Sequence, residues 1–164
     1  MGGKMRGAGR FGFAAITLLA AATTPVRAVD DRHSYSLINA SGGRVDFADQ
    51  AARMGQNGFV NFSILTVLAT GNVAYSLRDV SLNCAKAEIA TLTNINYAAN
   101  GAPLPSEAID STVQPISTGT LGQALQVVIC NGVDPFPRSK AILGITAAVA
   151  KAHDLIAAMG PPAK

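Results

Sequence analysis

The chain has 164 residues, 49% of them hydrophobic and 14% charged, and this length suits one domain with a modest core. Four of its 13 Lys and Arg residues lie within residues 1–28, whereas all ten acidic residues follow that segment. Once residues 1–28 are removed, nine basic residues face ten acidic ones. No basic stripe then remains to follow a phosphate backbone, which excludes nucleic acid as an expected partner.

The first 28 residues have the pattern of an export signal. Three basic residues precede an uncharged apolar run over residues 11–22, and a small-residue cleavage site ends at Ala28. The twelve residues of that run would span about 18 Å as a helix, too short for the ~30 Å hydrocarbon core, so we expect no permanent membrane span. A buried N-terminal helix is the alternative. The pattern predicts a periplasmic, extracellular or cell-surface protein.

The segment after the leader is rich in predicted strands. Residues 34–38 and 44–48 predict two short strands, and the second alternates polar and apolar residues as a half-buried strand does. Residues 49–54 predict a short helical turn or an irregular crossover. Gln56-Asn57-Gly58 predicts a tight hairpin turn, because Asn-Gly tolerates positive φ values. Residues 59–68 are nearly all β-branched or apolar, which predicts a central strand.

Two further strands are predicted at residues 75–84 and 87–97. Arg78 shares the face of the first of these strands that carries its apolar side chains, and we expect its head group at an edge or in solvent. A turn at Asn100-Gly101 and a proline-containing loop follow. Residues 113–116 then predict a short edge strand, because the proline within them cannot donate to a central ladder.

Residues 120–130 predict a helix with clear end signals. Thr120 and Gln123 form a capping box at its start, and Asn131-Gly132 supplies a stop at its end. An apolar stripe at helical spacing predicts that one face packs against the sheet; its members are Leu121, Ala124, Leu125 and Val128.

The two cysteines, Cys84 and Cys130, end the predicted strand and this helix. In an exported chain, two cysteines most often pair, because that compartment is oxidising. The bridge would close a loop of 45 residues, for which the chain-entropy account predicts about 4 kcal/mol of stabilisation. Two separate buried thiols are the alternative. A metal site is not expected, because His33 and His153 have no ligand spacing with either cysteine.

A second helix is predicted at residues 139–159, where apolar residues repeat at a–d spacing over three heptads. Gly160-Pro161-Pro162 ends it. The stripe has two interpretations at this point: it docks on the chain's own sheet, or it docks on a partner copy and makes a homo-oligomer. Its members are Ile142, Ile145, Val149, Ala152, Ile156 and Met159.

Residues 82–130 resemble the surface-adhesin protein E-like family of exported bacterial proteins. Three stretches carry the resemblance: Asn83-Cys84-Ala85-Lys86, then Asn96-Tyr97-Ala98-Ala99-Asn100-Gly101, then Ser117-Thr118-Gly119-Thr120-Leu121-Gly122-Gln123-Ala124-Leu125 with a closing Val128-Ile129-Cys130. Residues 35–58 fit the family's strand, turn and crossover more loosely. The sequence departs from the family at Val113, where the family has a tryptophan, and in basic strand residues, which are reduced to Lys86.

This resemblance implies an α+β fold: a curved antiparallel sheet of about six strands with a C-terminal helix on its concave face, tethered by Cys84–Cys130. We expect residues 1–28 to be the signal peptide, 29–132 the sheet-plus-helix domain, and 133–164 a linker with the extra C-terminal helix. The best-known member of the family is a surface adhesin that binds host matrix proteins. An adhesin-like activity with a host matrix or envelope protein as partner is therefore implied.

Catalysis has little support in the residues, so we expect no enzyme, no catalytic residues and no cofactor. None of the nucleophile-elbow, phosphate-loop or zinc-helix motifs is present, and Asp46 and Asp49 predict a turn or a solvated pair rather than a site. The leading hypothesis is a binding module, and the alternative is a structural or self-assembling envelope component. The candidate surfaces are the sheet face left uncovered by the first helix, the 56–58 hairpin tip, and the 139–159 helix.

Overall fold

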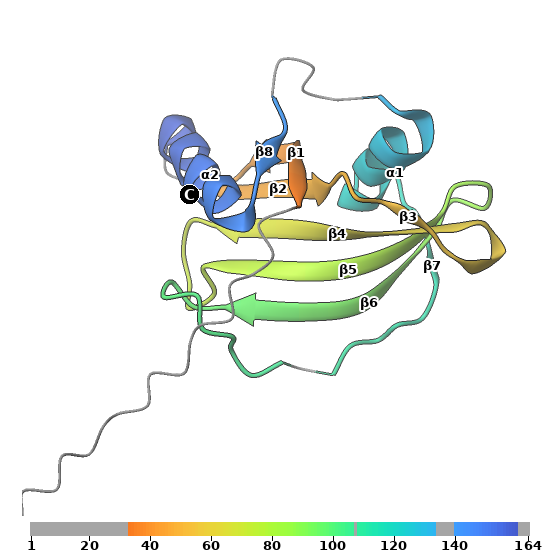
Figure 1. Cartoon of the computed structure of the whole chain (residues 1–164), viewed down its shortest axis with the longest axis horizontal. Helices are drawn as coiled ribbons and strands as arrows, with labels where there is room; N and C mark the ends of the chain where they lie inside the picture. The colour runs from red at the N-terminus through yellow and green to blue at the C-terminus, as the bar shows by residue number, and fades with distance from the viewer. Residues whose placement is uncertain (1–32, 107, 134–139, 161–164) are drawn as a thin grey trace, which may run out of the picture.

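A computed structural model describes residues 33–106, 108–133 and 140–160 (Figure 1). The predicted export signal and its cleavage site lie outside these residues. The described chain is α+β, with one open antiparallel sheet and two helices, which confirms the predicted fold class. No helix in these ranges is both long and apolar enough to cross a bilayer.

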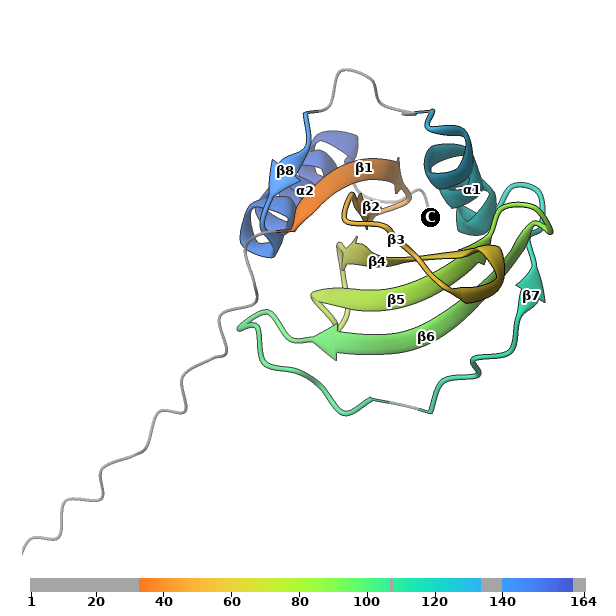
Figure 2. The ribbon, with the colours of Figure 1, turned by 45° about the vertical axis from the view of Figure 1, so that its right-hand side comes forward.

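The sheet contains eight strands among the described residues, two more than the sequence predicts, and its order is β7-β6-β5-β4-β2-β1-β8, with β3 also paired to β4. Strands β4 to β6 are long, and β5 and β6 bend along their length (Figure 2). The strands are β1 (Ser34–Ser41), β2 (Arg44–Asp49), β3 (Arg53–Met54), β4 (Phe59–Leu68), β5 (Tyr75–Asn83), β6 (Glu88–Tyr97), β7 (Gln114–Pro115) and β8 (Ile142–Leu143).

The additional strands are the short ones, β3 and β8, of two residues each. β3 lies where the sequence predicts a helical turn or crossover, and it pairs with β4 through the hairpin around Asn57-Gly58. Both of those residues have positive φ, as the Asn-Gly signal predicts, although the tip forms a 3₁₀ turn, η1 (Gln56–Gly58). β7 is an edge strand paired only with β6, as its proline predicts.

The two helices, α1 (Leu121–Asn131) and α2 (Ile145–Met159), cover opposite faces of the sheet. Side chains alternate between the two faces of the sheet along a strand, so residues adjacent in sequence point to opposite faces. In β4, Leu65 and Val67 pack with α2, whereas Phe62 and Ile64 pack with α1. The core is therefore two apolar clusters that share one sheet, and the central strands are buried on both sides.

Helix α1 begins and ends as the sequence predicts. The Thr120 hydroxyl accepts the Gln123 backbone N–H at 3.4 Å, and Gly132 closes the helix in the left-handed conformation. The second half of the predicted capping box differs, because the Gln123 side chain accepts from the Gly119 N–H at 2.7 Å. Figure 2 shows β5 and β6 bending toward α1, which lies inside the curve. A disulfide joins Cys130 of α1 to Cys84, with Cα atoms 5.6 Å apart.

Helix α2 starts at Ile145, six residues later than predicted. Ile142 belongs to β8, which pairs with Tyr35 of β1, so it is not part of the helical stripe. Within α2 most of the stripe packs into the chain's own core: Ile145 is 5% exposed, Ala152 is fully buried, and Val149 and Ile156 are partly buried against the same cluster. Ala148, outside the predicted stripe, is also fully buried, whereas Met159 at the end of the helix is exposed. Of the two interpretations of this stripe, the structure agrees with the first: α2 packs on the chain's own sheet.

Candidate functional site: the polar half of the α1 face

The sheet face that carries α1 is divided into an apolar and a polar half. The strand register places residues on this face in rows that run across the strands. The rows beneath α1 are apolar, and there Val80 and Leu82 pack against Leu125 of the helix. Beyond the N-terminus of α1 the rows consist mostly of polar side chains. We call these residues the polar half: Asn39, Ser41, Arg44, Asp46, Thr66, Ser76, Arg78, Asn94 and Asn96.

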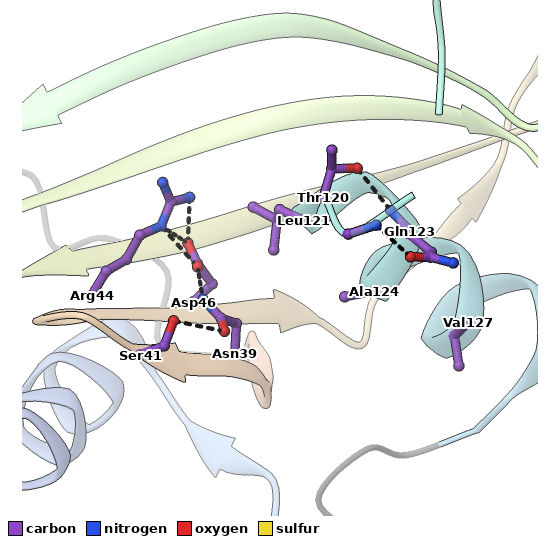
Figure 3. Close-up of a pocket in the computed structure, with 10 residues that line it drawn as sticks. Asn39, Ser41, Arg44, Asp46, Thr120, Leu121, Gln123, Ala124 and Val127 are labelled. Atoms are coloured by element: carbon purple, nitrogen blue, oxygen red, sulfur yellow. Dashed lines mark hydrogen bonds and ion pairs between the residues drawn. The ribbon is translucent and has the colours of Figure 1, made fainter. Parts of the chain in front are cut away.

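Asp46 is the centre of the polar half and is fully buried. Its carboxylate accepts two-point bonds from Arg44, at 2.9 and 2.8 Å from Nε and 2.7 Å from Nη2. It also accepts from the Thr66 hydroxyl at 2.6 Å and from the Asn39 amide at 3.0 Å. Figure 3 shows Arg44 and Asn39 converging on this carboxylate. Such a charged group is tolerated inside the protein because every one of its lone pairs has a donor to bind.

A groove of about 590 Å³ separates this cluster from the first turns of α1. One wall consists of strand residues from β1 and β2, including Arg44 and Asp46. The other wall is the start of α1, where Leu121 lies between the ion pair and the capped helix end (Figure 3). The groove thus combines hydrogen-bonding groups on the sheet with an apolar wall on the helix, which is the composition of most ligand sites.

A second cavity, of about 300 Å³, lies on the same face and is lined by Arg78. Its other walls come from the loop before α1 and from the first turn of α1, including Thr120 and Leu121. Burial lowers the pKa of the Arg78 guanidinium from its usual value; the charge of Arg44 lowers it further, and Asp46 opposes the change. Arg78 is thus a half-buried cation beside another cation.

Arg78 has no counterion among the described residues. The ion pairs found there are His33–Asp49 and Arg44–Asp46. Across the ladder, Arg78 is directly opposite Asn94, whose Oδ1 is buried and has no hydrogen-bond donor. One register position of the sheet thus holds a cation without an anion and an acceptor without a donor. A buried acceptor without a donor is rare in protein interiors, and beside it Arg78 is a half-buried cation whose charge no described carboxylate pairs, which makes this position the strongest candidate for a binding site.

Several expectations about individual residues are wrong. Asp46 and Asp49 are not a solvated pair: both are buried, on opposite faces, and Asp49 bonds to His33. Arg78, expected at an edge or in solvent, lies on the inner strand β5 and is half-buried. The sheet face opposite α1 is not free along β1, β2 and β4, because α2 packs there. The 56–58 tip is exposed, as a candidate surface requires.

The polar half itself was not predicted, although one signal for it existed. Arg44, Asp46 and Thr66 are polar residues on one face of two neighbouring strands. An Arg-x-Asp pair on one face of a strand brings opposite charges together, which favours a paired cluster over a solvated one. In the part of the chain that the structure describes, no group of three or more His, Cys, Asp or Glu residues is arranged to hold a metal ion.

No protein-family model matches the sequence, and no curated protein matches it either. Among solved structures, protein E of Haemophilus influenzae, in its crystal form II, is similar to this chain, with a TM-score of 0.50 and 13% sequence identity. The similarity covers 66% of this chain and 93% of the protein E chain. At that identity the likeness concerns the fold alone, and it shows that this chain has a protein E-like fold.

Proposed function

We propose that this protein is an exported, non-enzymatic binding domain of adhesin-like character, whose partner is a host matrix or envelope protein. The observation that carries the proposal is the burial of the α2 stripe. An exposed stripe would favour self-assembly, whereas Ile145, Ala148 and Ala152 are buried within the single chain. A closed domain that leaves a polar groove open favours binding of a second molecule.

The protein E-like fold and the disulfide support the same proposal. The disulfide fits an oxidising compartment outside the cytoplasm, as the predicted export signal does. We accordingly propose a periplasmic or cell-surface location after cleavage of residues 1–28. The adhesin-like activity is what the resemblance of residues 82–130 to the protein E-like family implies, and the solved neighbour supports the fold on which that resemblance depends.

The test is direct binding by the mature, disulfide-intact protein. The immobilised protein is titrated with a panel of purified extracellular-matrix proteins and with fractions of envelope extract. Saturable binding to one protein component supports the proposal. The control is the same protein reduced and alkylated, which presents the same composition without the bridge. If no protein component binds saturably, the proposed function is wrong.

The alternative, a self-assembling envelope component, predicts a different result in the same preparation. Light scattering of the mature protein over a wide concentration range gives the mass of the species in solution. A monomer at all concentrations agrees with the buried α2 stripe. A defined oligomer, with no saturable partner, would favour the structural role.

A further inference from the structure

We propose that the cavity lined by Arg78 is a receptor for a single carboxylate side chain presented by a peptide segment of the partner protein. This inference deepens the proposed function by naming the chemistry that the partner offers. It rests on the geometry of the α1 face, in which Arg78 is a cation without an ion-pair partner among the residues that the structure describes.

Arg44 and Arg78 differ in how their charges are satisfied. Arg44 is bound at two points by Asp46, and that carboxylate also binds Thr66 and Asn39, so it has no capacity left for a second guanidinium. Arg78 therefore keeps its full charge while half-buried. A guanidinium presents a planar set of N–H donors that matches a carboxylate in two-point geometry, and partial burial strengthens such a pair.

The charge balance favours a monoanion over a phosphate or a sulfated glycan. Arg44 and Asp46 cancel, which leaves one positive charge on Arg78 inside the cavity. Asp110 lines the same cavity from the loop before β7, but it is exposed to solvent and bonded to Thr112, and it forms no ion pair with Arg78. Its charge is screened by water at the rim, where it disfavours ligands that carry several negative charges.

The remaining walls favour a peptide over a free small anion. Apolar side chains line the cavity beside Arg78, among them Ile64, Ile89 and Leu121, and these suit the carbon atoms that flank a carboxylate. Polar side chains also line the cavity, among them Gln114 and Ser117, and both can accept a hydrogen bond. A peptide segment carries a carboxylate for Arg78 and N–H groups that can donate to these side chains, whereas inorganic phosphate at neutral pH offers almost only acceptors.

The test is titration of the mature protein with two capped tripeptides, acetyl-Leu-Glu-Leu-amide and acetyl-Leu-Gln-Leu-amide. Binding is followed in every protein through the backbone ¹⁵N–¹H resonances of Thr120 and Leu121, which line the cavity, and in the proteins that keep Arg78 also through its side-chain Nε. We expect saturable shifts with the Glu peptide and affinity for the Gln peptide lower by about tenfold, because a charge-assisted pair is replaced by a neutral hydrogen bond. Inorganic phosphate and sulfate are titrated in parallel, and we expect both to bind more weakly than the Glu peptide.

Four variants assign the effect to this cavity. Arg78→Gln should lower the affinity for the Glu peptide about tenfold. Arg53→Gln, which removes an exposed arginine from β3, should leave this affinity unchanged. Asp110→Asn should raise the affinity for the Glu peptide about twofold, because it removes the screened repulsion between Asp110 and the carboxylate of the peptide. Arg78→Lys keeps the charge but loses the two-point geometry, so its affinity should fall between those of the wild type and Arg78→Gln. Thermal unfolding of each variant separates a local effect from loss of the fold.

Four outcomes would overturn the inference: equal affinity for the Glu and Gln peptides, equal losses in Arg78→Gln and Arg53→Gln, tighter binding of phosphate or sulfate than of the Glu peptide, or a melting temperature that Asp110→Asn lowers in the wild type but not in Arg78→Gln. The last would show that Asp110 is itself the partner of Arg78, because weaker hydrogen bonds to Thr112 would act equally in both backgrounds. Failure here and failure of the proposed function are distinguishable. A partner that binds while the Glu peptide does not would reject the carboxylate site alone, and the reverse would reject the protein partner.

Discussion

Arg44 and Asp46 form a two-point ion pair between residues two positions apart on one strand, with the carboxylate fully buried and the arginine side chain 38% exposed. The pair faces α1, while Val45 between them faces α2. One strand of six residues thus supplies the apolar core on one side and the charged centre of the candidate site on the other.

Breaking this pair should be costly and non-additive. Arg44→Met leaves the buried Asp46 carboxylate without its cation, and we expect a loss of about 2–4 kcal/mol in the free energy of unfolding, toward the low end because Arg44 is partly exposed. The double variant with Asp46→Asn should lose less than the two single losses added together, because the unpaired charge is gone. Urea unfolding measures all three. Arg53→Met is the matched control, and an effect of similar size there would contradict the assignment.

Helix α2 should be required for cooperative folding. The sequence alone suggests that a chain ending at Asp134 stays folded, since the sheet, α1 and the bridge are complete by Gly132. The structure changes that expectation, because α2 fills the cluster around Val45, Phe47 and Leu65. We expect the chain ending at Asp134 to lose its cooperative thermal transition. A cooperative transition near the wild-type temperature would show that the α2 contacts contribute little.

A point substitution in α2 tests the same packing without truncation. Ile145→Ala should lose about 2–4 kcal/mol, because Ile145 is 5% exposed and its removal leaves a cavity against the sheet. Met159→Ala is the control at the other end of α2, where the side chain is 40% exposed, and it should lose less than about 1 kcal/mol. Equal losses in urea unfolding would contradict the buried stripe.

Alkaline pH should destabilise the fold through Tyr35. Burial, followed by the charges of Asp49 and Asp79, raises the pKa of this phenol well above its ordinary value of 10.0. The unfolded chain therefore loses this proton at lower pH than the folded chain. The stability contributed by the neutral phenol is complete below about pH 10 and decreases as the pH rises above it. Tyr35→Phe should flatten this decrease in urea unfolding, and an unchanged slope would contradict it.

Local patterns were enough to predict the long elements. The apolar run of β4, the Asn57-Gly58 hairpin and the caps of α1 at Thr120 and Gly132 depend on residues close in sequence. Two-residue strands such as β3 and β8 are too short for any periodicity to appear, and for the same reason Ile142 was assigned to the following helix.

Burial of the polar half could not be predicted in the same way. A polar residue between Val45 and Phe47 predicts the solvent side of a strand. That reasoning fails at Asp46, because α1 and α2 come from distant sequence and cover both faces. The same limit applies to Arg78, for which the sequence predicts an edge or a solvent position. The position of β5 within the sheet depends on β6 and β4 pairing on either side of it, and no local pattern shows that pairing.

The mature protein should begin at Val29. Residues 26–28 provide the small residues that signal peptidase requires at its cleavage site. N-terminal sequencing of the exported protein is the measurement. A start within residues 11–22, or retention of that apolar run, would contradict the predicted leader and remove the basis for an oxidising compartment.

The Cys84–Cys130 bridge should supply a large share of the stability. Cys84 follows β5, whose Val80 and Leu82 face α1, and Cys130 lies in the last turn of α1, so both cysteines pack against the same apolar cluster. Replacing both by serine frees a loop of 45 residues in the unfolded chain, and we expect a loss of about 2–4 kcal/mol in the free energy of unfolding. That is a substantial fraction of the roughly 5–15 kcal/mol typical of a domain.

Mass measurement after alkylation, with and without reductant, counts the thiols, and urea unfolding of the double variant measures the loss. Two free thiols in protein recovered from the periplasm would contradict the bridge, and an unchanged unfolding midpoint in the double variant would show that α1 is held by its apolar contacts alone.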